Sequence, residues 1–223
     1  MSRLASLSLA AVLLAPLGAV AGDHGAAPAA PAPEAVLKQL KAGNARFVAG
    51  KAAHPDGSAA RRKELTKGQN PKAVILSCSD SRVPPELVFD EGLGDLFVVR
   101  VAGNVADPVN LGSVEYAAEH LGTGVVVVLG HHSCGAVKAT AEAGGKAEGN
   151  IGAIVAEIAP AVAAAKANPG KEGLLDDASH ANARRAAAAL TERSPVLAKL
   201  VEEKKLVIKT AVYDLASGVV EFE

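Results

Sequence analysis

The stretch AVILSCSDSRVPPE, residues 73–86, begins like a buried β-strand and then places Cys78, Asp80 and Arg82 at alternate positions. Its apolar part, Ala73 to Leu76, is one of three short runs of aliphatic residues; the others are Leu96 to Val101 and Gly124 to Leu129. Such runs, which do not alternate with polar residues, are typical of strands covered on both faces. A thiol, a carboxylate and a guanidinium at the end of such a strand need a chemical explanation.

The order of the segments predicts the fold. Residues 110–122, NLGSVEYAAEHLG, have apolar residues at helical spacing and separate the second run from the third. Strands joined by such a helix form a right-handed crossover and lie parallel. An Ala-rich helical pattern interrupted by Pro160, a helix from about Ser179 to Leu190 and a closing hairpin around residues 216–218 follow. We therefore predict a single α/β domain with a central, mostly parallel sheet flanked by helices.

The N-terminal residues predict export. Residues 1–21 combine Arg3, an apolar run from Leu9 to Leu17 and small residues near Ala21, which is the pattern of a cleaved signal peptide. An uncleaved anchor is the alternative, but the run is shorter than the ~20 residues of a membrane span. Residues 22–33 form an Ala/Pro-rich linker, so the domain is predicted over 34–223. We expect a periplasmic or secreted protein with no membrane segment after cleavage.

Charge and composition narrow the class of protein. Lys and Arg number 23 against 24 Asp and Glu, and the basic residues are not clustered. This distribution predicts no nucleic-acid partner. A hydrophobic fraction of 49% excludes general disorder.

Cys78, His131 and Cys134 form a candidate metal site. The first strand is expected to end at Cys78, and the third strand leads into GHHSCG, residues 130–135, where a helix begins. In an open parallel sheet the carboxyl ends of the strands meet in one crevice. Two thiolates and an imidazole suit Zn²⁺, and three ligands leave a fourth position open, as in catalytic zinc sites. In an exported protein a disulfide between Cys78 and Cys134 is the alternative.

Asp80 and Arg82 could manage a water molecule at such a site. Alternation along the strand would place both on the side of Cys78, where Arg82 could hold Asp80 in a bidentate pair. The ionised Asp80 would accept a hydrogen bond from zinc-bound hydroxide and orient it toward an electrophile. A structural salt bridge is the alternative.

The sequence resembles the β-class carbonic anhydrases at these residues. The similar segments are GNARFVAG, CSDSRVPPELVFDEGLGDLFVVRVAGN, SVEYAAEHLG, GHHSCGAVKA and SPVLAKLVEEKKLVIKTAVYDLASGVVEF, which extend over residues 43–222. The resemblance implies about four parallel strands plus a C-terminal strand. It also implies an obligate homodimer that in many members pairs into tetramers.

The resemblance also implies roles for individual residues. One Zn²⁺ per chain would be bound by Cys78, His131 and Cys134, beside the Asp80 and Arg82 dyad. Gln69, Phe97, Tyr116 and Gly135 match positions that line the substrate pocket at the dimer interface, and His120 matches a position proposed for proton relay. His132 is expected to be a polar neighbour, while His24, His54 and His180 are expected to be solvated.

The implied reaction is the hydration of CO2 to bicarbonate and a proton, with zinc-bound hydroxide as nucleophile. Carbon disulfide or carbonyl sulfide hydrolysis on the same scaffold is one alternative, because the same ligands would serve it. A noncatalytic exported zinc-binding or disulfide-stapled protein is the other, and it predicts no use for Asp80.

Overall fold

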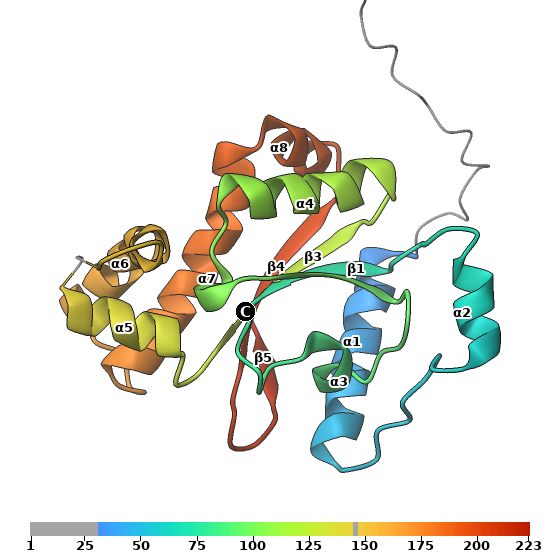
Figure 1. The fold of residues 1–223 in the computed structure, drawn as a ribbon, viewed down its shortest axis with the longest axis horizontal. Helices are drawn as coiled ribbons and strands as arrows, with labels where there is room; N and C mark the ends of the chain where they lie inside the picture. Colours follow the sequence, from blue (N-terminus) through green and yellow to red (C-terminus); the bar gives the residue numbers. More distant parts are fainter. Residues whose placement is uncertain (1–30, 145–146) are drawn as a thin grey trace, which may run out of the picture.

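A five-stranded sheet forms the centre of the molecule (Figure 1). The computed structural model describes residues 31–144 and 147–223, so the predicted signal peptide and linker residues 22–30 lie outside the described residues. The strand order is β2-β1-β3-β4-β5; the first four are parallel and β5 is antiparallel to β4. The strands are β1 (Ala73–Ser77), β2 (Leu96–Arg100), β3 (Val125–His131), β4 (Val207–Tyr213) and β5 (Val220–Phe222). The predicted parallel sheet with a C-terminal strand is confirmed.

Helices cover both faces of this sheet. On one face α4, α7 and α8 pack against Val126 and Val128, and on the other α1 and α3 pack against Val125 and Val127. Successive strand residues point to opposite faces, so an unbroken apolar run is what a strand between two helical layers requires. The helices are α1 (Pro33–Val48), α2 (Ala59–Leu65), α3 (Pro85–Val88), η1 (Ala102–Asn104), α4 (Pro108–His120), α5 (Gly135–Ala143), α6 (Ile151–Ala167), α7 (Leu174–Arg193) and α8 (Pro195–Glu202).

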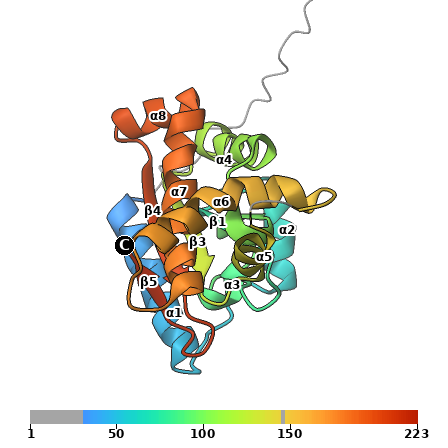
Figure 2. The ribbon, with the colours of Figure 1, turned by 90° about the vertical axis from the view of Figure 1, so that its left-hand side faces the viewer.

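A third apolar cluster lies beyond the carboxyl ends of β1 and β3. There lie α5 and α6 (Figures 1 and 2). They contribute Val137 and Ile158, which pack with Cys78 and Cys134. The cysteines therefore sit between the end of the sheet and these two helices.

Two sequence-based expectations need correction. β2 is an edge strand whose residues Leu96 to Val98 remain partly exposed, so it is not covered on both faces as its apolar run predicted. Pro160 does not interrupt its helix, because α6 continues through it to Ala167. A proline inside a helix costs about 3 kcal/mol, which burial of the neighbouring Ile158, Ala161 and Val162 offsets.

Within residues 31–144 and 147–223, no helix is both long enough and apolar enough to cross a membrane.

Candidate metal centre

Three side chains that could bind a metal converge at the carboxyl end of the sheet. Cys78 directly follows β1, His131 is the last residue of β3, and Cys134 is the N-cap of α5. Their two sulfur atoms and one ring nitrogen all lie within 4.8 Å of one another, and all three residues are buried. Because β1 and β3 pair in parallel, both strands deliver their ends to the same place.

His131 presents a free nitrogen to this cluster. Its Nδ1 lies 2.9 Å from the carbonyl oxygen of His132, which fixes Nδ1–H as the donor. Its Nε2 is buried and has no hydrogen-bond partner among the described residues. A buried ring nitrogen held in this way is the usual arrangement of a metal-ligating histidine.

Both cysteines are free thiols in the structure, so they are not joined in the disulfide considered as an alternative. The pKa of Cys78 is lowered to about 4, chiefly by a hydrogen bond from the Cys134 thiol, with the Gly103 N–H adding to it. The same hydrogen bond and burial raise the pKa of Cys134. A divalent cation would replace the proton that Cys134 shares with Cys78. The two sulfur atoms and the ring nitrogen therefore fit a borderline-soft metal such as Zn²⁺.

Gly103 contributes to the cluster through its backbone. Its N–H donates to Cys78 Sγ at 3.3 Å. Its φ is +73°, and a Cβ at this position would lie 2.4 Å from Ile158 Cδ1. Only glycine permits this approach. The buried Asn182 of α7 holds the loop by donating to the Gly103 carbonyl at 2.7 Å.

Asp80 and Arg82 form a bidentate pair beside the cluster. Arg82 donates through Nε to Oδ1 at 2.9 Å and through Nη2 to Oδ2 at 2.7 Å. These hydrogen bonds, with that from the Arg82 backbone N–H, hold the pKa of Asp80 well below its usual range. Asp80 Oδ2 lies 3.8 Å from His131 Nε2, so a carboxylate anion faces the position a metal would take.

The route by which these residues meet differs from the prediction. β1 ends at Ser77, so strand alternation does not align Cys78, Asp80 and Arg82. A turn does so instead, and Arg100 at the end of β2 holds it by donating to the carbonyl oxygens of Cys78 at 3.0 Å and Asp80 at 2.6 Å. Sequence reasoning missed Arg100, although a charged residue near the end of an apolar strand could have indicated it.

Comparisons with known proteins identify the family of the chain. A family profile described as "Carbonic anhydrase" matches residues 73–220. A carbonic anhydrase of Mycolicibacterium smegmatis is 44% identical over 194 residues, covering 85% of this chain and 92% of the relative. Carbonic anhydrase 2 of Mycobacterium tuberculosis is 42% identical over 191 residues, covering 83% and 90%. The chain belongs to the β-carbonic anhydrase family.

Solved β-carbonic anhydrases share the fold. The enzyme of Aspergillus fumigatus superposes with a TM-score of 0.66 at 26% identity, covering 85% of this chain and 89% of that chain. A protein described as a tetrameric β-carbonic anhydrase, from Sordaria macrospora, gives the same TM-score at 23% identity, covering 85% and 96%. The predicted fold and family are thus confirmed, and the chain is an enzyme of this family.

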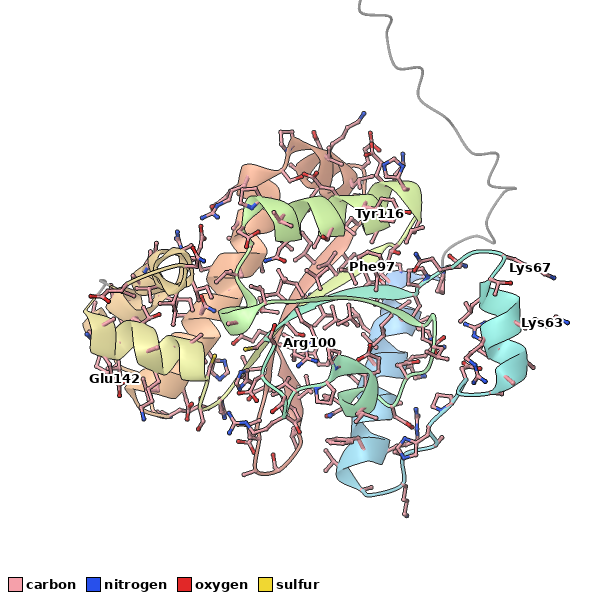
Figure 3. The ribbon with its side chains drawn as sticks, in the orientation of Figure 1. Lys63, Lys67, Phe97, Arg100, Tyr116 and Glu142 are labelled. Atoms are coloured by element: carbon pink, nitrogen blue, oxygen red, sulfur yellow. The ribbon has the colours of Figure 1, made fainter. Side chains whose placement is uncertain are left out.

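Most residues matched to the family's substrate pocket lie away from the cluster of the same chain. In the β1–β2 register Phe97 pairs with Val74, four residues before Cys78, which is roughly 13 Å of strand. Tyr116 of α4 contacts Phe97, with ring centroids 6.2 Å apart (Figure 3). Gln69 is in an exposed loop. By contrast, Gly135 adjoins Cys134, and a Cβ there would meet no described atom within 4 Å.

The remaining histidines differ in environment. His120 ends α4 with 63% of its side chain exposed and stacks on Tyr116. Because α4 begins after β2 and returns to the start of β3, His120 lies at the amino end of the sheet, opposite the cluster. His54 is exposed, as predicted, and His24 lies outside the described residues. The prediction that His180 is solvated is wrong: its side chain is 14% exposed and contacts His132.

Proposed function

We propose that this chain catalyses the reversible hydration of CO2 to bicarbonate and a proton, with one Zn²⁺ bound by Cys78, His131 and Cys134. The observation that carries the proposal is the buried Nε2 of His131, which has no hydrogen-bond partner among the described residues and lies close to two buried thiols, beside a carboxylate held by arginine. Membership of the carbonic anhydrase family supports it.

Zinc bound there would lower the pKa of a coordinated water and supply a nucleophile near neutral pH. The chain's own residues then decide how that water is used. Asp80, kept ionised by Arg82, can only accept hydrogen bonds. It therefore accepts one from the attacking water and directs a lone pair of the water oxygen toward the carbon of CO2. The reaction consumes one water and one CO2 and returns a bicarbonate and a proton.

The edge of the sheet supports assembly into a homodimer, with tetramers as a second stage. β2 is an edge strand, and beside it Tyr116 leaves 48% of its surface exposed. Pairing two copies there would cover this apolar surface and bring Gln69, Phe97 and Tyr116 toward the cluster of the other chain. His120, which contacts Tyr116, would be brought toward the same cluster. We propose that it could serve there as a proton relay.

We further propose that the chain is exported to the periplasm or secreted, on the strength of residues 1–21. Fractionation of expressing cells tests this, because the processed chain should appear outside the cytoplasm.

Stopped-flow measurement of CO2 hydration by the zinc-loaded protein tests the activity. Asp80→Asn should retain zinc and lower kcat/KM by about 10²- to 10⁴-fold, because an amide can donate a hydrogen bond where only acceptance is useful. Asp56→Asn, an exposed carboxylate in a separate turn, is the matched control. Wild-type protein with one zinc per chain and no activity above buffer would refute the proposal. Release of sulfide from carbonyl sulfide, without CO2 hydration, would assign the site to the rival hydrolase.

A further inference from the structure

A second group of metal-ligating side chains meets next to the first. His132 follows β3, Glu172 lies in the loop between α6 and α7, and His180 is on α7. The Nε2 atoms of the two histidines are 3.2 Å apart. Glu172 Oε2 lies 3.2 Å from the first and 3.0 Å from the second. Three potential ligand atoms thus form a nearly equilateral triangle.

Two further carboxylates orient the histidine rings. Glu223 Oε1 lies 2.7 Å from Nδ1 of His180, and Asp214 Oδ2 lies 3.2 Å from Nδ1 of His132. Ser217 donates twice to the other oxygen of Asp214, which fixes that carboxylate. Ionised carboxylates only accept hydrogen bonds, so each Nδ1 carries the proton. In neutral rings each Nε2 then turns a lone pair toward the other and toward Glu172.

Three lone pairs at this spacing repel one another unless a proton or a metal cation lies between them. A tetrahedral metal with bonds of 2.0–2.2 Å to nitrogen and oxygen places its ligand atoms about 3.3 Å apart. The separations of 3.0–3.2 Å are close to this value. Two imidazoles and one carboxylate suit Zn²⁺, Co²⁺ or Ni²⁺, and carboxylates on the outer nitrogens are the usual support of metal-bound histidine.

Charge and access favour a dication. Glu172, Asp214 and Glu223 bring three carboxylates, and the neighbouring Arg184, which donates to Glu223 at 2.8 Å, offsets one. A surface pocket of about 640 Å³ is lined by Glu172, His180 and Glu223. The Glu172 side chain is 43% exposed, so ions and water reach the triangle. In Figures 1 and 2 the C-terminus lies beside α7, as these contacts require.

We propose that His132, Glu172 and His180 form a second, exchangeable binding site for a divalent transition metal. The site is separate from Cys78, His131 and Cys134 and does not depend on the proposed activity. A bound metal would tie the loop that carries Glu172 to α7 and the end of β3, so it should raise the thermal unfolding temperature.

The test is metal stoichiometry of the full-length protein that retains its tightly bound zinc. After dialysis against micromolar Zn²⁺ or Co²⁺, elemental analysis should find two metals per wild-type chain. Added Co²⁺ should give only weak d–d absorption, because the second site has no thiolate and lacks sulfur-to-metal charge transfer. The unfolding temperature should rise with Co²⁺ concentration, as binding to the native state requires.

Variants identify the ligands. His180→Asn should abolish the second equivalent, and Glu172→Gln, at an exposed position where folding is not at risk, should weaken its binding at least about tenfold. His54→Asn and Glu202→Gln, both exposed and outside the triangle, should bind like wild type. A single metal per wild-type chain at saturating Co²⁺, or full binding by Glu172→Gln and His180→Asn, would overturn the proposal.

Discussion

His131 and His132 are adjacent in the sequence, but they belong to two different clusters. The side chain of His131 is fully buried and faces two thiols, whereas that of His132 is 20% exposed and faces a histidine and a carboxylate. A backbone carbonyl orients the first ring and Asp214 orients the second. Neighbouring residues at a strand end point to opposite sides, so one dipeptide supplies a buried, sulfur-rich site and an open, oxygen- and nitrogen-rich one.

Helix α7 shows the same division. His180 contributes to the open cluster, while Asn182, two residues later, supports the buried cluster through the carbonyl of Gly103. The difference suggests distinct exchange behaviour: a buried site with thiolates should hold its metal through purification, whereas a solvent-accessible site should equilibrate with the medium.

Replacing His131 rather than His132 should have the largest effect, on both zinc content and activity. His131→Ala should lose tightly bound zinc and lower CO2 hydration by at least about 10³-fold, since most of an enzyme's acceleration depends on its reacting groups. His132→Ala should keep the tightly bound zinc and lose only the exchangeable metal. Elemental analysis and stopped-flow kinetics on both variants check this. Equal loss of zinc and activity in the two variants would show that the clusters are one unit.

Replacing Asn182 should have a smaller effect, on stability and on metal binding by the buried cluster alone. Asn182→Ala leaves the carbonyl of Gly103 without its buried donor and frees the loop whose N–H supports Cys78. Zinc affinity should fall by about tenfold and the free energy of unfolding by about 1–3 kcal/mol, while uptake of the second metal is unchanged. Competition with a chelator and thermal unfolding measure these quantities. Asn150→Ala, an exposed asparagine without a side-chain cap bond, is the control; an effect as large there would contradict the prediction.

The smallest effect concerns the acid stability of the pair beside the buried cluster. Arg82 holds the pKa of Asp80 in the folded protein below its usual value. The pair therefore stabilises the folded state fully above the pKa of Asp80 in the unfolded chain, about 4, and this stabilisation is lost as the pH falls below that value. Arg82→Gln should therefore lower the unfolding temperature slightly at pH 7 and by less at pH 3. Unfolding curves at both pH values, with the exposed Arg62→Gln as control, test the sign. A difference that grows on acidification would be inconsistent with it.

The fold and the meeting of the three candidate ligands were predicted where the information is local. The runs at 73–76 and 124–129 became central strands because both helical layers bury them. Cys78, His131 and Cys134 lie at or just after strand ends, and parallel pairing brings those ends together. The strand at 96–100 was misjudged because an apolar run does not distinguish a central strand from an edge strand that a partner could cover.

Residues that act over long sequence distances were not predicted. Asn182 is 79 residues from Gly103, and Glu223 is 43 residues from His180. Neither residue lies in a motif, so only the packing of α7 against the sheet reveals its partner. His180 was expected to be solvated for the same reason: an isolated histidine on a polar helix carries no local pattern that indicates burial.

The sequence by itself determined the strand order along the chain, the three buried candidate ligands and the Asp80 and Arg82 pair, because each depends on apolar periodicity or on residues close together in the chain. Tertiary structure alone decided how the ligands are supported and where the second cluster lies. Hydrogen bonds between distant segments require that the helices first dock on the sheet, since the burial of apolar faces fixes which polar atoms meet.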